Sequence, residues 1–287
     1  MNSQNDTVTR SEGSTISPTA HYTGETWVRN DLSHPQLATW QGRMLHRAFA
    51  LPLTASKMVG GPTLDGPLVA RHRIIDSILD DLIRGGISQV VEIACGMSPR
   101  GWRFSERFGE RLTYVEADLP EMAQRKREAL ARMESLTDRH RVIDIDVLEE
   151  GGPASLEALV ETLDPAEGLV IITEGLLTYL DDDTVTALWA RFATALAQFG
   201  KGAYLSDLRF SRPDRGLPER TFDLILGAFV RGKVHAYRGD EAMAEAALRS
   251  AGFEGVRLHA GDEHPAAADV RSDPSAGAIS IIEASCG

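Results

Sequence analysis

The sequence has few cysteines and no long apolar run, and both scarcities limit what the protein can be. Cys95 and Cys286 lie far apart and form no CxxC or Cys/His spacing, so neither a disulfide framework nor a zinc site is expected. No stretch is long enough to span a bilayer, and the polar N-terminal segment lacks the pattern of a signal peptide. We therefore expect a cytoplasmic protein with no metal, no membrane contact and a disordered tail over residues 1–20.

Positive charge is scarce as well. Lys and Arg number 30 against 42 Asp and Glu, which gives a formal net charge of -12. Because neutralising phosphates needs clustered basic residues, nucleic acid is not an expected partner. The hydrophobic content of 43% and charged content of 25% are ordinary for a globular chain. A small molecule is the partner that the composition favours.

Short apolar runs alternate with helical patterns along the chain. Buried parallel strands are predicted at Gln89–Ala94, Leu112–Glu116 and Leu169–Thr173. Helices are predicted around them at Leu68–Ile83, Arg100–Phe108, Glu121–Met133, Leu156–Leu163 and Asp183–Phe199. Further strands are expected at Gly202–Asp207, Gly255–His259 and Ala278–Glu283, with a helix at Glu241–Ser250. This alternation predicts an α/β fold with a Rossmann-like, doubly wound and mostly parallel sheet.

Two segments depart from the alternation. Residues 21–60 contain aromatic and basic side chains in short helical pieces that we expect to break at Pro35 and Pro52. Residues 208–238 mix several arginines with apolar side chains. We therefore expect one domain over residues 21–287, with an N-terminal cap over 21–60 and a lid insertion over 208–238.

The turn after the first predicted strand contains Gly96, which lets a ligand approach the backbone because glycine has no Cβ. A dinucleotide enzyme favours G-x-G-x-x-G at this place, and the sequence has Ala-Cys-Gly-Met-Ser over residues 94–98. An NAD-dependent oxidoreductase is thus disfavoured. A ligand-binding module without catalysis is a third hypothesis.

Two acids stand at predicted strand ends. Asp118 follows the second strand, where an acid can accept hydrogen bonds from ribose hydroxyls, although it can also cap the helix that begins near Pro120. Glu174 ends the third apolar strand, where a buried carboxylate needs a cationic partner. That partner is either a cationic ligand or a local arginine, and the pattern alone leaves both open.

Four blocks of sequence carry a family resemblance. They are VARHRIID at Val69–Asp76, VVEIACGMSPRGWRF at Val90–Phe104, YVEADLPEMAQRKREAL at Tyr114–Leu130 and VIITEGLLTYL at Val170–Leu180. In order and spacing they resemble the leucine carboxyl methyltransferase family, especially its bacterial branch associated with O-methylation of polyketides and other secondary metabolites. The resemblance implies a class I methyltransferase fold and S-adenosylmethionine as the cofactor.

The resemblance also implies roles for single residues. Arg71 corresponds to an arginine that clamps the methionine carboxylate of the cofactor. Gly96 lies beside the methionyl part, Asp118 with its neighbour Leu119 holds the ribose, and Glu174 lies near the methionyl ammonium.

Further along the same pattern, Asp146 and Val147 correspond to the segment that meets adenine, and Asp144 competes with Asp146 for that place. Glu92 has a supporting role in fixing the loop. Cys95 is expected to be a small buried residue, since no histidine in the motif would activate it.

Methyl transfer to oxygen is the expected reaction, with a small-molecule carboxylate favoured by the resemblance and a phenolic or alcoholic hydroxyl as the competitor. A carboxylate is ionised at neutral pH and needs no general base, whereas a hydroxyl benefits from one. Tyr179 and His235 are the candidate catalytic residues. Candidates for binding an anionic acceptor are Trp27, Arg29, Arg43, His46 and Arg231.

Overall fold

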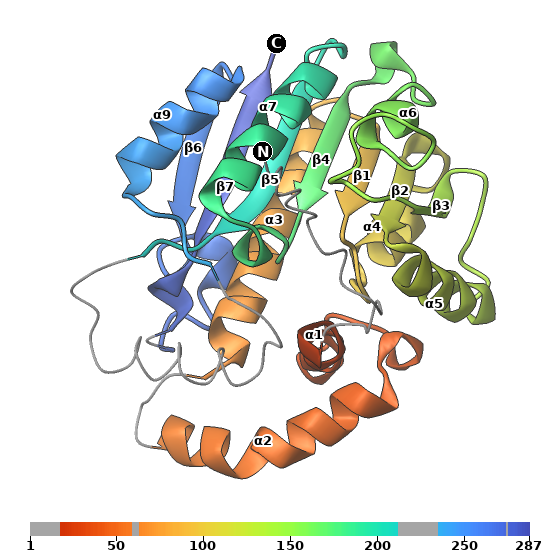
Figure 1. Ribbon diagram of the computed structural model, residues 1–287. Coiled ribbons are helices and arrows are strands. Elements are labelled where there is room, and N and C mark those ends of the chain that lie inside the picture. The colour runs from red at the N-terminus through yellow and green to blue at the C-terminus, as the bar shows by residue number, and fades with distance from the viewer. Residues whose placement is uncertain (1–17, 59–62, 212–234, 274) are drawn as a thin grey trace, which may run out of the picture.

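A computed structural model describes residues 18–58, 63–211, 235–273 and 275–287 of the chain (Figure 1). Its centre is a seven-stranded sheet in the order β3-β2-β1-β4-β5-β7-β6. The strands are β1 (Gln89–Ile93), β2 (Thr113–Asp118), β3 (His140–Asp144), β4 (Leu169–Thr173), β5 (Gly202–Leu208), β6 (Gly255–Ala260) and β7 (Ser280–Cys286). The first five pair in parallel, and β7 runs antiparallel to both of its neighbours. The predicted Rossmann-like α/β fold is confirmed.

Helices cover both faces of the sheet. They are α3 (Asp65–Arg84), α4 (Arg100–Phe108), α5 (Pro120–Arg132), α6 (Leu156–Val160), α7 (Asp182–Leu196) and α9 (Glu241–Ala251). Short 3-10 turns connect several of them, namely η1 (Pro35–Leu37), η2 (Gly109–Arg111), η3 (Pro165–Glu167), η4 (Leu177–Tyr179), η5 (Pro265–Ala267) and η6 (Ala276–Ala278). Because side chains alternate along a strand, Val90 belongs to the core cluster formed with α3 and α4 on one face, and Val91 belongs to the cluster on the other face, to which α6, α7 and α9 contribute.

The N-terminal segment forms two helices beyond the carboxyl ends of the parallel strands, α1 (Pro18–Arg29) and α2 (Trp40–Met58) (Figure 1). The expected tail over residues 1–20 overlaps the first turn of α1, and residues 1–17 lie outside the described residues. The expected break at Pro52 is wrong, because α2 continues through it. A proline removes one backbone donor from a helix, and a long helix can continue past it.

The strand β3 was not among the strands predicted from apolar runs. Only His140 and Val142 of this edge strand are buried, and Arg141 stands between them. A half-buried edge strand of this kind contains too few apolar residues to form a run. No helix in the described part of the chain is long and apolar enough to cross a membrane.

Candidate active site

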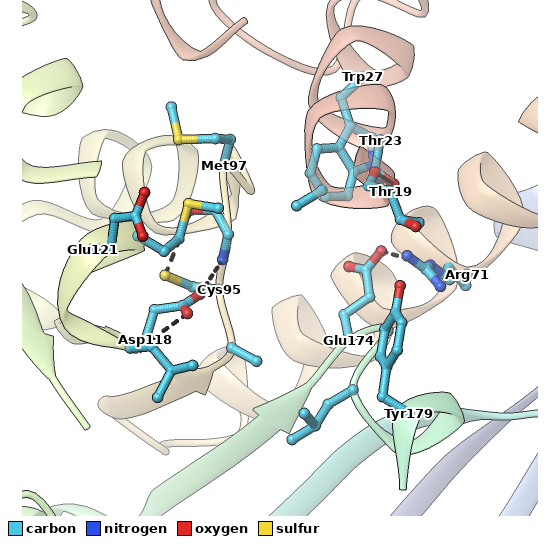
Figure 2. A pocket seen from close by; sticks show the side chains of 17 residues that line it. Thr19, Thr23, Trp27, Arg71, Cys95, Met97, Asp118, Glu121, Glu174 and Tyr179 are labelled. Carbon is cyan, nitrogen blue, oxygen red and sulfur yellow. Dashed lines mark hydrogen bonds and ion pairs between the residues drawn. The ribbon is translucent and has the colours of Figure 1, made fainter. Parts of the chain in front are cut away.

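A cavity of about 360 Å³ lies between the carboxyl ends of the parallel strands and α1 (Figure 2). Its walls come from α1, α3, the end of β2, the first turn of α5 and the loops after β1 and β4. The lining residues are Thr19, Ala20, Thr23, Trp27, Arg71, Ala94, Cys95, Gly96, Met97, Asp118, Leu119, Glu121, Met122, Glu174, Gly175, Leu176 and Tyr179. Ligands of open α/β sheets bind at this edge, so the cavity is the candidate active site.

One end of the cavity is formed by the loop after β1 and the end of β2. The Gly96 amide donates a hydrogen bond of 2.7 Å to Asp118 Oδ2, and the Leu119 amide donates one of 2.8 Å to Asp118 Oδ1. Gly96 has a φ of +51°, and a Cβ there would meet nothing within 4 Å. Glycine is therefore favoured at this position by its backbone conformation, and the loop leaves open space beside it. Burial raises the pKa of Asp118 despite the two hydrogen bonds.

The opposite end is built on Arg71 of α3. Its Nε donates to Glu174 Oε1 at 3.0 Å, and its Nη1 donates to Asp207 Oδ2 at 3.1 Å. Gly175 follows Glu174 with a φ of +77°, and a Cβ at this glycine would lie 2.9 Å from Arg71 Nη2. The Gly175 amide in turn donates to Asp207 Oδ1 at 2.6 Å. In Figure 2 the Tyr179 hydroxyl points toward Arg71 and Glu174.

Arg100 supports this end from within the protein. It is the first residue of α4 and is fully buried. Its guanidinium donates to Asp76 Oδ1 at 2.6 Å, to Glu92 Oε1 at 2.6 Å and to Glu174 Oε2 at 2.5 Å. His72 Nδ1 also lies 2.9 Å from Glu174 Oε2. Glu174 thus has three basic neighbours.

These neighbours decide the charge of Glu174. Burial alone would raise its pKa, but His72, Arg100 and Arg71 hold the pKa of the carboxyl well below its usual range. Glu174 is therefore ionised at neutral pH although it is almost wholly buried. Of the two partners that the sequence left open for Glu174, the structure contains the local arginines, which bind the carboxylate at the wall of the cavity.

The structure brings several predicted residues together at the cavity. Those that line it are Trp27, Arg71, Gly96, Asp118, Leu119, Glu174 and Tyr179. Glu92 lies beneath the site, where it binds Arg100 and accepts a hydrogen bond of 2.7 Å from the Tyr114 hydroxyl. These contacts are with Arg100 and Tyr114, and the role of Glu92 in fixing the loop stays a prediction.

The two aspartates predicted near adenine lie outside the described lining. Asp144 forms an ion pair of 2.8 Å with Arg127 on the surface. Asp146 accepts a hydrogen bond of 3.0 Å from the Leu148 amide, and Val147 packs in the core. The adenine assignment of Asp146 and Val147 stays a prediction.

Of the predicted acceptor-binding residues in the N-terminal cap, Trp27 lines the cavity and the others do not. Positions 19, 20, 23 and 27 lie on one face of α1, and that face lines the cavity. Arg29 is on another face and pairs with Glu25 at 3.0 Å, while Arg43 is exposed on α2. His46 is buried against Thr26, with its Nε2 2.8 Å from the hydroxyl.

Two further candidates concern the lid. The main-chain amide of His235 donates to the Thr178 carbonyl at 2.8 Å, and the residue lines a separate small cavity. Arg231 lies outside the described residues, as does most of the expected lid. Their roles in catalysis and acceptor binding therefore stay predictions.

The residues that sequence reasoning missed are of two kinds. Thr19, Thr23, Met97, Glu121 and Met122 line the cavity, and a helix predicted to begin at Pro18 would have placed the first two. Arg100 and Asp207 act from behind the wall. Their partners are distant in sequence, so no local pattern reveals them.

Comparisons with known proteins agree with the fold and the motifs. The sequence model of the leucine carboxyl methyltransferase family matches residues 28–193. A protein of Frankia alni, provisionally named an S-adenosyl-L-methionine-dependent methyltransferase, is 32% identical over 63% of this chain and 54% of its own length. A protein of Streptomyces avermitilis with the same provisional name is 33% identical over 55% of this chain and 52% of its own length. The chain thus spans about half the length of the curated relatives it matches.

Solved structures show the same fold. A DUF574 family protein from Streptomyces avermitilis has a TM-score of 0.63 at 16% identity, covering 93% of this chain and 96% of that one. The S-adenosylmethionine-dependent methyltransferase SibL, in its apo form, has a TM-score of 0.54 at 15% identity, covering 94% of this chain and 70% of that one. At these identities the likeness shows the fold alone, which is that of the class I methyltransferases.

Proposed function

The chain belongs to the leucine carboxyl methyltransferase family, and on this premise we propose that it is an S-adenosylmethionine-dependent O-methyltransferase that forms methyl esters on a small-molecule carboxylate. The observation that carries the proposal is the single cavity that joins Gly96 and Asp118 at one end to Arg71 and Glu174 at the other.

The charges of the cavity fit the cofactor. S-adenosylmethionine carries a sulfonium, an ammonium and one carboxylate, so it bears more positive than negative charge. The described lining contains three carboxylates, on Asp118, Glu121 and Glu174, and one guanidinium, on Arg71. Asp118 is suited to the ribose, Arg71 to the methionyl carboxylate and Glu174 to the ammonium. The open space at Gly96 leaves room for the ligand beside the backbone.

The bound cofactor supplies an electrophilic methyl group, so the protein has mainly to position the acceptor and to exclude water. Apolar side chains from three segments exclude water, namely Trp27 of α1, Met97 of the loop after β1 and Leu176 after β4. Tyr179 stands beside Arg71 and Glu174, where its hydroxyl can orient an acceptor oxygen (Figure 2).

A carboxylate acceptor is favoured because the described lining offers few candidates for a general base. It contains no histidine or lysine. Glu174 is held by basic neighbours that lower its pKa, and a base of low pKa is inefficient near neutral pH. Both oxygens of Asp118 accept backbone hydrogen bonds. A carboxylate needs no deprotonation, whereas a phenol or alcohol does.

An acceptor for this wall is largely apolar beyond its carboxylate, since α1 presents Ala20 and Trp27 to the cavity beside Thr19 and Thr23. We place the reaction in secondary metabolism on the strength of the motif resemblance described above.

The acceptor class can be tested with methyl-labelled S-adenosylmethionine and matched pairs of aromatic and aliphatic acids, phenols and alcohols. Mild alkali releases the label from a methyl ester as methanol and leaves a methyl ether intact. We expect alkali-labile label on acids, and no transfer by an Asp118→Ala variant. Alkali-stable label on phenols or alcohols would replace the carboxylate with a hydroxyl, and label found only on nitrogen or carbon would overturn O-methylation.

A further inference from the structure

We propose that Lys126 is a positioning residue of the cofactor site, whose buried ammonium group holds the loop after β1 in its ligand-binding shape. Lys126 lies on α5 and does not line the cavity. The inference rests on the proposed function, because it assigns to this residue a part of the affinity for S-adenosylmethionine.

Lys126 contacts the underside of the loop after β1 and a buried carboxylate of β2. The side chain is fully buried, and Nζ donates to the Ser98 carbonyl at 2.5 Å and lies 3.5 Å from the Gly96 carbonyl. It also forms an ion pair with the buried carboxylate of Glu116 on β2. His140 Nε2 lies 2.8 Å from the other oxygen of that carboxylate. The ammonium thus joins α5 and β2 to the loop.

Stability alone does not account for this arrangement. Taking a lysine and a glutamate out of water is costly, and a well-packed apolar pair of similar size is often as stable or more stable. What an apolar pair cannot provide is a donor for the loop. The carbonyls of Gly96 and Ser98 face the protein interior, and a buried carbonyl without a donor is unfavourable.

The loop needs to be held because its backbone is unusual. Ala94 and Gly96 both have positive φ values, 54° and 51°. For Ala94 this backbone conformation is unfavourable, because alanine has a Cβ and glycine does not. Asp118 fixes the cavity side of the loop through the Gly96 amide at 2.7 Å. Lys126 fixes the opposite side through the carbonyls. In a motif with one glycine, these two side chains hold the turn that presents the backbone to the ligand.

Lys126 also bears on the charge of Asp118. Burial raises the pKa of Asp118, and the nearby Lys126 ammonium counteracts part of that rise. The lysine therefore keeps the ribose-binding acid closer to its ionised, accepting form. The hydrogen bonds of Lys126 to the loop and its effect on the pKa of Asp118 therefore both favour binding of the ligand.

The test uses the double variant Lys126→Met/Glu116→Gln, which removes both charges and leaves an amide oxygen for His140. S-adenosylhomocysteine binding is measured by calorimetry, with thermal unfolding as the check of folding. We expect a folded protein whose affinity falls about 10-fold or more, the loss typical of a charged hydrogen bond. In turnover, we expect KM for S-adenosylmethionine to rise while kcat changes little, because the substitution weakens binding of the cofactor. A purely structural effect would instead lower the apparent kcat, since a smaller fraction of the enzyme would be folded and active.

A surface control shows whether the loss of any ion pair affects binding. The double variant Arg249→Met/Glu245→Gln removes an exposed ion pair of 2.9 Å on α9, and it should change nothing in binding. If Lys126→Met/Glu116→Gln does not fold, Lys126→Gln/Glu116→Gln takes its place, with a loss of about 3-fold expected from the weaker donor.

Wild-type affinity in a folded Lys126 double variant would overturn the inference and leave the proposed function intact. An equal loss of affinity in Arg249→Met/Glu245→Gln would also overturn it, because the effect would then not be specific to Lys126. A wild-type protein that does not bind S-adenosylhomocysteine would count against the proposed function itself.

Discussion

At the scale of single residues, Arg71 and Glu174 already bind each other across the end of the cavity. Arg71 also binds Asp207, so its Nε and Nη1 are engaged and Nη2 faces Gly175. The methionyl carboxylate would therefore bind a guanidinium whose conformation is already fixed by Glu174 and Asp207. Such preorganisation lowers the entropic cost of binding.

Arg71→Lys should weaken S-adenosylhomocysteine binding about 10- to 100-fold, because an ammonium cannot bridge two carboxylates and still offer a planar pair of donors. Calorimetry measures the loss. Arg73→Lys is the matched control, since Arg73 lies two residues away on the same helix and pairs with Asp269 near the surface. Equal affinities for the two variants would contradict the assigned role of Arg71.

Gly175→Ala should lower the affinity about 10-fold, because the new Cβ would lie 2.9 Å from Arg71 Nη2 in addition to the strain of a positive φ. Gly151→Ala separates the two effects. Gly151 has a nearly equal φ of +74°, but a Cβ there meets nothing within 4 Å. Both variants should lose stability in thermal unfolding through the positive φ, and only Gly175→Ala should also lose binding. A parallel loss of binding in both would show that strain alone is responsible.

The family motif predicted four positions that lie together, since Arg71, Gly96, Asp118 and Glu174 all line one cavity, and their roles toward the cofactor stay predictions. Arg100 and Lys126 could not be found in this way. A charged residue on a helix looks in sequence like part of a solvated face. Their partners, Glu92, Glu116 and Glu174, become visible only when the strands are assembled.

At the scale of elements, α1 is the part of the N-terminal cap that reaches the cavity. Its lining positions follow helical spacing from Thr19 to Trp27, which turns Arg29 away. Without the start of α1 at Pro18, sequence reasoning could not decide which of Trp27 and Arg29 faces inward. The strands β1, β2, β4 and β5 could be predicted because they are buried on both faces. The half-buried edge strand β3 could not.

Trp27→Ala should raise KM for the acceptor about 10-fold or more, because it removes a large apolar surface from the wall. Trp40→Ala on α2 is the control, since Trp40 is 63% exposed and does not line the cavity. Steady-state kinetics with a carboxylate acceptor distinguish the two. An unchanged KM in Trp27→Ala would remove α1 from the acceptor site.

At the scale of the whole molecule, buried ionised groups make stability depend on pH. Asp76, Glu116 and Glu174 are buried acids whose pKa values lie below the usual 3.8 and 4.5, since basic neighbours outweigh the effect of burial. Each contributes stability that is fully present above its unfolded pKa and is lost as the pH falls toward its folded pKa. Glu92 and Asp118 have raised pKa values and act in the opposite direction.

Glu174→Gln should therefore flatten the dependence of the melting temperature on pH. We expect wild-type protein to lose more stability than this variant between pH values of about 5 and 3, the range around the usual glutamate pKa. Thermal unfolding followed by circular dichroism across that range gives the comparison. Parallel curves for the two proteins would mean that Glu174 is not held ionised by His72, Arg100 and Arg71.

The most direct test of the central claim is calorimetric titration of the wild-type chain with S-adenosylhomocysteine and, separately, with NAD. A charge-complementary cavity with a one-glycine loop predicts one S-adenosylhomocysteine bound per chain, lost in Asp118→Ala, and no binding of NAD. Binding of NAD without binding of S-adenosylhomocysteine would contradict the account.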